Sequence, residues 1–141
     1  MSNIEHTLSI IKPDAVERNL DNEIKEMFKN KGFSIVKEKK IQIEKSEAEK
    51  FYKVHETKPF YNDLCAYLSS GPIVVMILEK ENAVSGNREL MGATNPNDAE
   101  EGTIRKKHAV SLEKNSVHGS DSLENAVIEI AHFFSENEIH P

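Results

Sequence analysis

One histidine of this sequence, His118, stands where an imidazole could react with phosphate. It lies in the string Asn115-Ser116-Val117-His118-Gly119-Ser120-Asp121-Ser122, and the overlapping Asp121-Ser122-Leu123-Glu124 has the spacing of a helix capping box. The free N–H groups and the dipole of a helix N-terminus attract anions, and a neutral imidazole is nucleophilic near neutral pH. These features predict a histidine that takes up a phosphoryl group covalently. The alternative is a loop histidine that only hydrogen-bonds to the nearby backbone.

The arginines point to an anion site as well. Only three occur in the chain, and two of them, Arg88 and Arg105, lie on either side of Thr94. Residues 91–119 show no apolar period; Arg88 lies just before this stretch and Arg105 within it. A guanidinium group suits phosphate oxygens, and a hydroxyl with exposed loop amides would complete an anion cradle. Surface ion pairs with nearby acids are the alternative. Neither a Walker loop nor a Rossmann turn occurs, so a nucleotide would be held without them.

Five further residues are candidates for binding. Lys12 follows an apolar strand and could reach over a sheet edge, Tyr52 and His55 share one helical face, and Phe60 and Leu64 could clamp a base. The alternatives are a solvated lysine, a surface histidine and packed core side chains. The histidines other than His118 show no zinc-site spacing, so we expect no metal ion held by the protein's own side chains.

The elements that must position these residues follow from the apolar patterns. Strands are expected over residues 7–11, 33–43 and 73–78, with a short one just before His118. Helices are expected from Asp21 to a left-handed cap at Gly32, after the capping box at Ser46, after Pro59, over 82–90 and from the capping box at Asp121. This order predicts an α+β split βαβ sandwich, an antiparallel sheet with helices on one face.

Length and composition restrict the class of protein. At 141 residues the chain has the size of one domain, so we expect a single domain over residues 1–141. A net charge of −6 argues against binding to nucleic acid or to an anionic membrane surface. The longest aliphatic run, Ile73–Leu78, is far shorter than the roughly 20 residues of a membrane helix. Because no secretory signal is visible and Cys65 is the only cysteine, a reducing cytoplasm is expected.

Five separated strings resemble the nucleoside diphosphate kinase family in order and spacing. They are Ile11-Lys12-Pro13-Asp14-Ala15-Val16; Phe51-Tyr52-Lys53-Val54-His55 with Pro59-Phe60; Asn87-Arg88-Glu89-Leu90-Met91-Gly92-Ala93-Thr94-Asn95-Pro96; Gly102-Thr103-Ile104-Arg105; and the string around His118. The resemblance implies a ferredoxin-like fold and a ping-pong transfer of the γ-phosphate of a nucleoside triphosphate, typically ATP, to a nucleoside diphosphate. It also implies a homo-oligomer, a tetramer or a hexamer, and Mg²⁺ bound mainly through the nucleotide phosphates.

The resemblance also implies roles for individual residues. It makes His118 the nucleophile through Nδ1, with its Nε2–H held by Glu129, although Glu129 lies off the apolar stripe of its expected helix. The residues that it implies for phosphate binding are Lys12, Tyr52, Arg88, Thr94 and Arg105, with His55 near the α-phosphate and Ser120 beside the nucleophile. It implies that the base stacks on Phe60, between Leu64 and Leu112. It implies that Lys12 and Asn115 contact the sugar.

Two other functions compete with this interpretation. An RNA-recognition module can share the strand and helix order, but it stacks bases on aromatic residues of its central strands. The strands expected at 7–11 and 73–78 carry no aromatic residue, which disfavours that class. The other alternative is a catalytically silent nucleotide-binding scaffold of the same fold.

Overall fold

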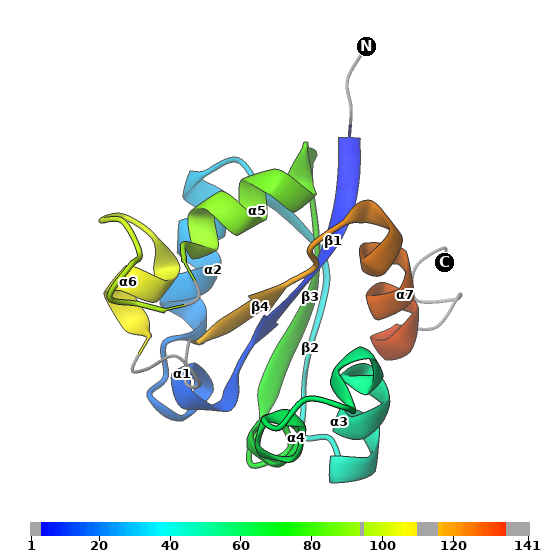
Figure 1. The fold of residues 1–141 in the computed structure, drawn as a ribbon. Coiled ribbons are helices and arrows are strands. Elements are labelled where there is room, and N and C mark those ends of the chain that lie inside the picture. The colour runs from blue at the N-terminus through cyan, green and yellow to red at the C-terminus, as the bar shows by residue number, and fades with distance from the viewer. Residues whose placement is uncertain (1–3, 94, 110–115, 135–141) are drawn as a thin grey trace.

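A four-stranded antiparallel sheet forms the centre of the molecule. The computed structural model describes residues 4–93, 95–109 and 116–134 (Figure 1). The strands have the order β2-β3-β1-β4 across the sheet, and every neighbouring pair is antiparallel. Their bounds are β1 Ile4–Ile11, β2 Ser34–Ile41, β3 Ile73–Glu81 and β4 Val117–Gly119. The short edge strand β4 places His118 opposite Ile10 of β1, so the candidate nucleophile is fixed by the sheet itself.

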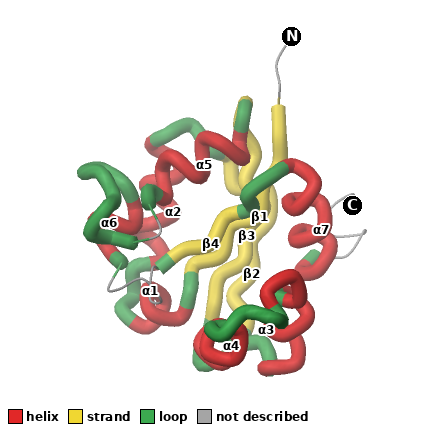
Figure 2. The backbone as a smooth tube through the Cα atoms, viewed as in Figure 1, coloured by secondary structure: helices red, strands yellow, loops and turns green. Residues whose placement is uncertain are grey.

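Helices cover both faces of this sheet (Figure 2). They are α1 Pro13–Glu17, α2 Asp21–Asn30, α3 Lys45–Phe51, the 3-10 turn η1 Lys53–His55, α4 Tyr61–Leu68, α5 Ala83–Met91, α6 Ile104–His108 and α7 Leu123–Phe133. In β3, Val74, Met76 and Leu78 face the core beneath α1, α2 and α5, while Ile73, Val75 and Ile77 face the core beneath α3, α4 and α7. The expectation of helices on one face only is therefore wrong, because a strand buried on both faces needs a helical layer on each.

The helices and strands mostly lie where the local sequence patterns predict them, whereas two helix caps lie elsewhere. The expected strands and long helices are present, and Gly32 has the left-handed φ of 87° that ends α2. The capping box at Ser46 is wrong, because the N-cap of α3 lies two residues earlier, at Glu44, and makes no side-chain hydrogen bond. At α7 the cap is Ser122, whose hydroxyl accepts from the Asn125 N–H, rather than Asp121. Where tertiary packing sets the first turn of a helix, the N-cap residue can differ by one or two positions from the one that the sequence pattern predicts.

Two elements inside the aperiodic stretch are too short to show a period. Helix α6 was not predicted, whereas a short strand was expected just before His118 and β4 includes His118 itself. Helix α6 is five residues long and is capped by Thr103, whose hydroxyl accepts from the Lys106 N–H. Strand β4 is three residues long and pairs only with β1. Among the described residues, no helix has the length and apolar character that crossing a bilayer requires.

Candidate active site

The imidazole of His118 is held by a carboxylate from the neighbouring helix. Nε2 of His118 lies 3.0 Å from Oε1 of Glu129 in α7, and the Ser120 hydroxyl donates to the same oxygen at 2.8 Å. The side chain of His118 keeps 21% of its surface exposed. Because a carboxylate only accepts, the Glu129 contact requires the proton on Nε2. Nδ1 of the neutral ring therefore keeps its lone pair for reaction.

Ser120 links this pair to the sheet. Its backbone N–H donates to the Leu8 carbonyl at 3.2 Å, and its hydroxyl lies 3.4 Å from the Leu8 N–H. The residue is fully buried. The carboxylate of Glu129 is thus oriented by a hydroxyl that the backbone of β1 holds in place, so that the imidazole of His118, the carboxylate of Glu129 and the hydroxyl of Ser120 form one fixed group.

A run of aromatic rings leads away from the nucleophile. The ring of Phe51 contacts that of His118 at a centroid distance of 5.2 Å, and Phe51 contacts Tyr52 at 5.1 Å. The ring centroids of Tyr52 and His55 are 6.2 Å apart, and those of His55 and Phe60 are 5.9 Å apart. Tyr52 is buried, and burial raises the pKa of its hydroxyl. The run joins the nucleophile to the exposed ring of Phe60.

Phe60 and Leu64 occupy different environments. The Phe60 side chain is 47% exposed at the N-terminus of α4, whereas Leu64, one turn later, packs partly against the core beneath α3 and α7. An exposed aromatic ring of this kind offers a face on which a base can stack. The alternative that both residues are core side chains holds only for Leu64.

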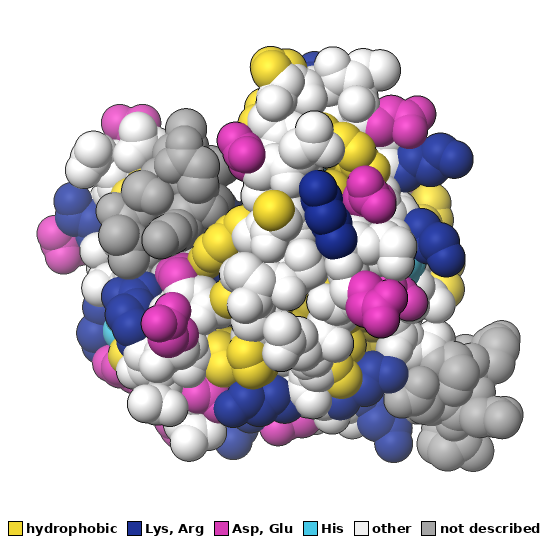
Figure 3. Space-filling model, turned by 90° about the horizontal axis from the view of Figure 1, so that it is seen from below, with side chains coloured by type: hydrophobic (Ala, Val, Ile, Leu, Met, Phe, Trp, Pro, Cys, Tyr) yellow, Lys and Arg dark blue, Asp and Glu magenta, His cyan; other side chains and the backbone are white. Residues whose placement is uncertain are grey.

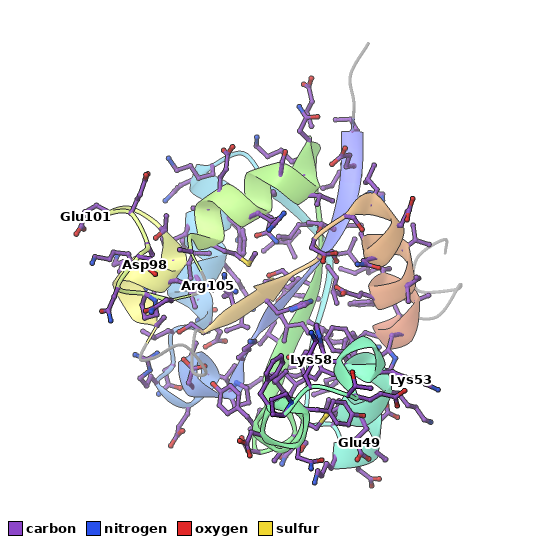
Figure 4. All side chains as sticks on the ribbon, in the orientation of Figure 1. Glu49, Lys53, Lys58, Asp98, Glu101 and Arg105 are labelled. Carbon is purple, nitrogen blue, oxygen red and sulfur yellow. The ribbon has the colours of Figure 1, made fainter. Side chains whose placement is uncertain are left out.

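Arg105 is a buried cation between α6 and β4 (Figure 4). Its guanidinium donates to the Gly92 carbonyl at 3.1 Å and to the Val117 carbonyl at 3.0 Å, while Nε has no hydrogen-bond partner within the described part of the chain. Burial first, and then the charge of Arg88, lower the pKa of Arg105. The contact with Val117 brings the guanidinium next to the strand of His118. The alternative of a surface ion pair is wrong for Arg105, which is only 8% exposed.

A cavity of about 630 Å³ opens beside the two arginines. Its lining combines Arg88, Arg105 and Thr103 with three carboxylates, Glu89, Asp98 and Glu100, and with Met91, Gly92 and Ala93. His118 is not among the lining residues, although Val117 before it binds Arg105. On the face shown in Figure 3, Lys and Arg side chains are interspersed with Asp and Glu. The lining of the cavity is therefore mixed as well, with two arginines against three carboxylates.

Lys12 lies between β1 and α1 and is only 5% exposed. Burial and the nearby charge of Arg105 lower its pKa to about 8, against an opposing influence of Asp14. The alternative of a solvated lysine is therefore wrong for Lys12. Its backbone N–H donates to the Ser116 carbonyl at 2.8 Å, which ties the β1–α1 turn to the start of β4.

Asp14 anchors the turn that carries Lys12. Its carboxylate accepts from the Ser116 hydroxyl at 2.8 Å, from Arg18 at 3.1 Å and from the Tyr67 hydroxyl. These donors come from three separate parts of the chain. The backbone next to Lys12 is therefore held from several directions, which keeps the buried ammonium near Arg105.

The structure therefore assembles the predicted residues in part. It brings His118, Ser120 and Glu129 together, and it places Tyr52, His55 and Phe60 in one run of rings. Lys12 and Arg105 interact through their charges, as do Arg105 and Arg88. Thr94, Leu112 and Asn115 lie outside the described residues. No group of three or more His, Cys, Asp or Glu side chains in residues 4–93, 95–109 and 116–134 is arranged to hold a metal ion.

Phe51 is the contact that the sequence interpretation missed. Its contact with the ring of His118 depends on how the end of α3 lies against β4 and α7. The two residues are far apart in the chain, so no local spacing connects them. Only the proximity of Phe51 to Tyr52 in the sequence could have drawn attention to it.

The sheet order, the two helical layers and the oriented histidine define an α+β, ferredoxin-like phosphotransferase. The family model described as nucleoside diphosphate kinase matches residues 5–139. Over 136 residues the chain is 59% identical to a nucleoside diphosphate kinase of Nitratiruptor sp., covering 96% of this chain and 99% of the relative. It is 57% identical to one of Granulibacter bethesdensis, covering 96% and 97%.

Solved structures agree with this comparison. A crystal structure of the Aquifex aeolicus nucleoside diphosphate kinase superposes with a TM-score of 0.94 at 38% identity, covering 96% of this chain and 98% of that one. An apo structure of the nucleoside diphosphate kinase from Encephalitozoon cuniculi gives a TM-score of 0.91 at 36% identity, with 95% and 91% covered. The chain belongs to the nucleoside diphosphate kinase family, and its function is nucleoside diphosphate kinase activity. The alternative of a silent scaffold is not favoured.

Proposed function

We propose that this enzyme moves the γ-phosphate of ATP to a nucleoside diphosphate in two half-reactions through a phosphohistidine at His118. In the first, the Nδ1 lone pair attacks the γ-phosphorus, an N–P bond forms, and the bond to the bridging β–γ oxygen breaks as the diphosphate leaves. In the second, a β-phosphate oxygen of the acceptor attacks the phosphohistidine and the N–P bond breaks. The contact of Nε2 with Glu129 carries this proposal, because it frees Nδ1 and stabilises the positive charge that the ring gains.

Arg105, Arg88 and Lys12 would neutralise the negative charge of the transferring group and of the leaving diphosphate. Phosphoryl transfer needs mainly positioning and charge stabilisation. Arg105 fits this role because two backbone carbonyls fix its guanidinium before a nucleotide arrives. Thr94 and the hydroxyl of Tyr52 would complete the phosphate contacts, with His55 near the α-phosphate.

Mg²⁺ would enter with the nucleotide. The described side chains offer no cluster for a metal ion, so the fit is to an ion carried on the β- and γ-phosphate oxygens. When bound there, such an ion supplies further neutralisation of the phosphate charge.

The base would stack on the exposed ring of Phe60, with Leu64 and Leu112 beside it, while Lys12 and Asn115 would reach the sugar hydroxyls. Because every base has a π-face, stacking favours use of many nucleoside tri- and diphosphates rather than one. A comparison of kcat/KM for adenine, guanine, cytosine and uracil diphosphates tests this; discrimination of more than about a hundredfold would contradict it.

The cellular setting follows from the family resemblance and from composition. We propose a single domain over residues 1–141 that acts in the cytoplasm as a homo-oligomer, a tetramer or a hexamer, without binding nucleic acid or a membrane. The net charge of −6 and the single cysteine support this setting. Light scattering of the purified protein gives the number of chains, and filter binding at moderate salt tests RNA.

The decisive experiment is labelling with γ-labelled ATP. The unmodified protein is expected to take up a label that is acid-labile and stable in base, as a phosphohistidine is, and to lose it to an added diphosphate. His118→Ala is expected to take up none. A chain that binds nucleotide but takes up no label would be the silent scaffold, and an unchanged label in His118→Ala would place the nucleophile elsewhere.

A further inference from the structure

The ring of Phe51, the last residue of α3, packs against the ring of His118. Their planes meet at 74° and their centroids are 5.2 Å apart, which is an edge-to-face contact. It is separate from the contact that Glu129 makes with Nε2. The imidazole is therefore held both by a hydrogen bond and by an aromatic neighbour.

Phe51 is itself held from other directions. Its ring contacts Tyr52 at 5.1 Å, Phe133 at 5.2 Å and His132 at 5.6 Å. Tyr52 and Phe133 are both buried. A side chain packed among several rings cannot turn freely, so the contact that it makes with His118 has a fixed direction.

The hydrogen bond to Glu129 leaves one freedom of the nucleophile weakly restrained. One hydrogen bond restrains the ring only weakly against rotation about the Cβ–Cγ bond, because this outer torsion of a histidine side chain is broad. Such a rotation moves Nε2 away from Glu129 as well as changing the direction of Nδ1. The lone pair of Nδ1 lies in the ring plane. The rotation therefore turns it away from the phosphorus, and small misplacements of a reacting atom cost large factors in rate.

We propose that Phe51 is a positioning residue that sets the plane of the His118 ring, so that Nδ1 rather than another ring atom meets the γ-phosphorus. The inference rests on the proposed phosphohistidine at His118 and adds to it the reason why the ring presents one nitrogen. Glu129 selects the tautomer, and Phe51 selects the orientation.

The test uses the full-length protein with Phe51→Leu, which removes the ring and keeps an apolar side chain. Single-turnover labelling by ATP is expected to slow by roughly tenfold, while the dissociation constant for ADP stays within about twofold. Phosphorus NMR of the denatured phosphoprotein is expected to show an Nε2-phosphohistidine besides the Nδ1 isomer. The isomer ratio separates orientation from simple loss of stability, because a merely structural role would not move it. Phe51→Tyr keeps a ring at this position and is expected to restore both the rate and the single isomer.

Phe33→Leu is the matched control. Phe33 is also packed edge-to-face, against Phe28 with centroids 5.7 Å apart, but it belongs to the core on the other face of the sheet. This variant is expected to melt at a lower temperature with an unchanged isomer ratio and labelling rate.

The outcomes separate the two proposals. If the unmodified protein takes up no label at His118, the proposed function fails. If it is labelled and Phe51→Leu matches it in both rate and isomer ratio, only the role of Phe51 fails. A slow Phe51→Leu that keeps the single Nδ1 isomer and is not rescued by Phe51→Tyr would reduce Phe51 to a packing residue and overturn the inference.

Discussion

The two halves of the candidate site, one around His118 (the nucleophile half) and one around Arg105 and Lys12 (the cationic half), differ in how their charged groups are paired. In the nucleophile half, the Glu129 carboxylate accepts from both Nε2 of His118 and the Ser120 hydroxyl. In the cationic half, burial and then the charge of Arg105 lower the pKa of Lys12, while burial and then the charge of Arg88 lower the pKa of Arg105. Nε of Arg105 has no hydrogen-bond partner among the described residues. The hydrogen bonds of the first half are complete before a substrate binds, whereas the second half keeps this one buried donor, Nε of Arg105, unpaired within the described part of the chain.

This difference shows where the fold gives up stability for function. Burying a cation near another cation disfavours its charged form, and the lowered pKa of each group reports that cost. A polyphosphate placed between them would remove it. We therefore expect the cationic half to destabilise the free protein and to be stabilised by a bound anion, and the half with His118 to keep its orientation in both states.

Removing a cation is expected to have the largest effect among the variants considered below. Arg105→Ala is expected to lose roughly 10- to 1000-fold in transfer rate while the protein stays folded, because a preorganised charge donor is lost. Steady-state kinetics with ATP and a diphosphate measure the loss, and circular dichroism checks the fold. Lys106→Ala, an exposed neighbour on the same helix, is the control and is expected to keep full activity. Unchanged kinetics in Arg105→Ala would contradict its assignment to the clamp.

The nucleophile half is expected to respond less to a conservative change. Glu129→Gln keeps the shape and can still accept a hydrogen bond, but it loses the charge that stabilises the ring as it gains positive character. We expect a loss of roughly 10- to 100-fold in the labelling step with little change in nucleotide affinity. Rapid-quench measurement of phosphohistidine formation gives the rate, and Glu124→Gln, exposed at the start of the same helix, is the control. A loss confined to nucleotide affinity would place Glu129 in binding instead.

The two halves are joined by α5, whose Asn87 lies beside the strand of His118. A Cβ added at Gly119 would lie 2.3 Å from Nδ2 of Asn87 and 2.8 Å from Cε of Met91. Gly119→Ala is therefore expected to lower the free energy of unfolding by about 1–3 kcal/mol, as overpacked cores do.

Removing the opposing side chain tests whether the close approach is the cause. The double variant Gly119→Ala, Asn87→Ala is expected to recover part of that loss, which urea unfolding of both single variants and the double variant measures. Strict additivity of the two single effects would show that the contact between Asn87 and Gly119 is not responsible.

The smallest expected effect is the change of ATP affinity with pH, which depends on the charge of Lys12 in the cationic half. Lys12 has a pKa of about 8 in the folded protein, below its ordinary 10.5, so it loses its charge as pH rises through 8. Affinity for ATP is expected to fall by roughly tenfold between pH 7 and pH 9, since bound phosphate favours the protonated form. Lys12→Arg should flatten this profile in calorimetric titrations. An equal pH dependence in both proteins would remove Lys12 as its source.

The same pKa fixes the sign of a stability effect. Between pH 8 and 10.5 the unfolded chain binds more protons at Lys12 than the folded one does, so the contribution of this residue to stability rises with pH across that window. The lowered pKa corresponds to roughly 3 kcal/mol of destabilisation at neutral pH. Lys12→Met should therefore raise the free energy of unfolding at pH 7, with the difference from the unmodified protein shrinking by pH 10.5.

The sequence allowed much of the fold to be predicted because its signals are local. The apolar run at Ile73–Leu78 and the stripe of α7 report burial through the spacing of neighbouring residues, and both elements are where they were expected. Short elements such as α6 and β4 have too few residues to show a period. The order of elements alone predicts one helical layer. Strand β3 is buried on both faces and therefore requires two.

For the candidate site, the sequence predicted which side chains take part, but it did not predict their pKa shifts or their hydrogen-bond partners. The strings around Lys12, Arg88, Arg105 and His118 carried the family resemblance at fixed spacing. The role of Glu129 came from that resemblance alone, since its position off the apolar stripe of α7 gave no reason to expect it against His118. The structure supplied the reason: α7 packs against β1, and this brings Glu129 to His118 on the adjacent strand β4.

What the amino-acid order determined by itself is which side chains this protein can bring to a phosphate, because residue type and short-range spacing are written directly in the chain. Only the tertiary structure decided how those side chains are charged and aimed. The lowered pKa of Lys12, the carbonyls that hold Arg105 and the ring of Phe51 against His118 all depend on segments distant in sequence. Desolvation and ring packing arise only when such segments meet, so no local pattern could report them.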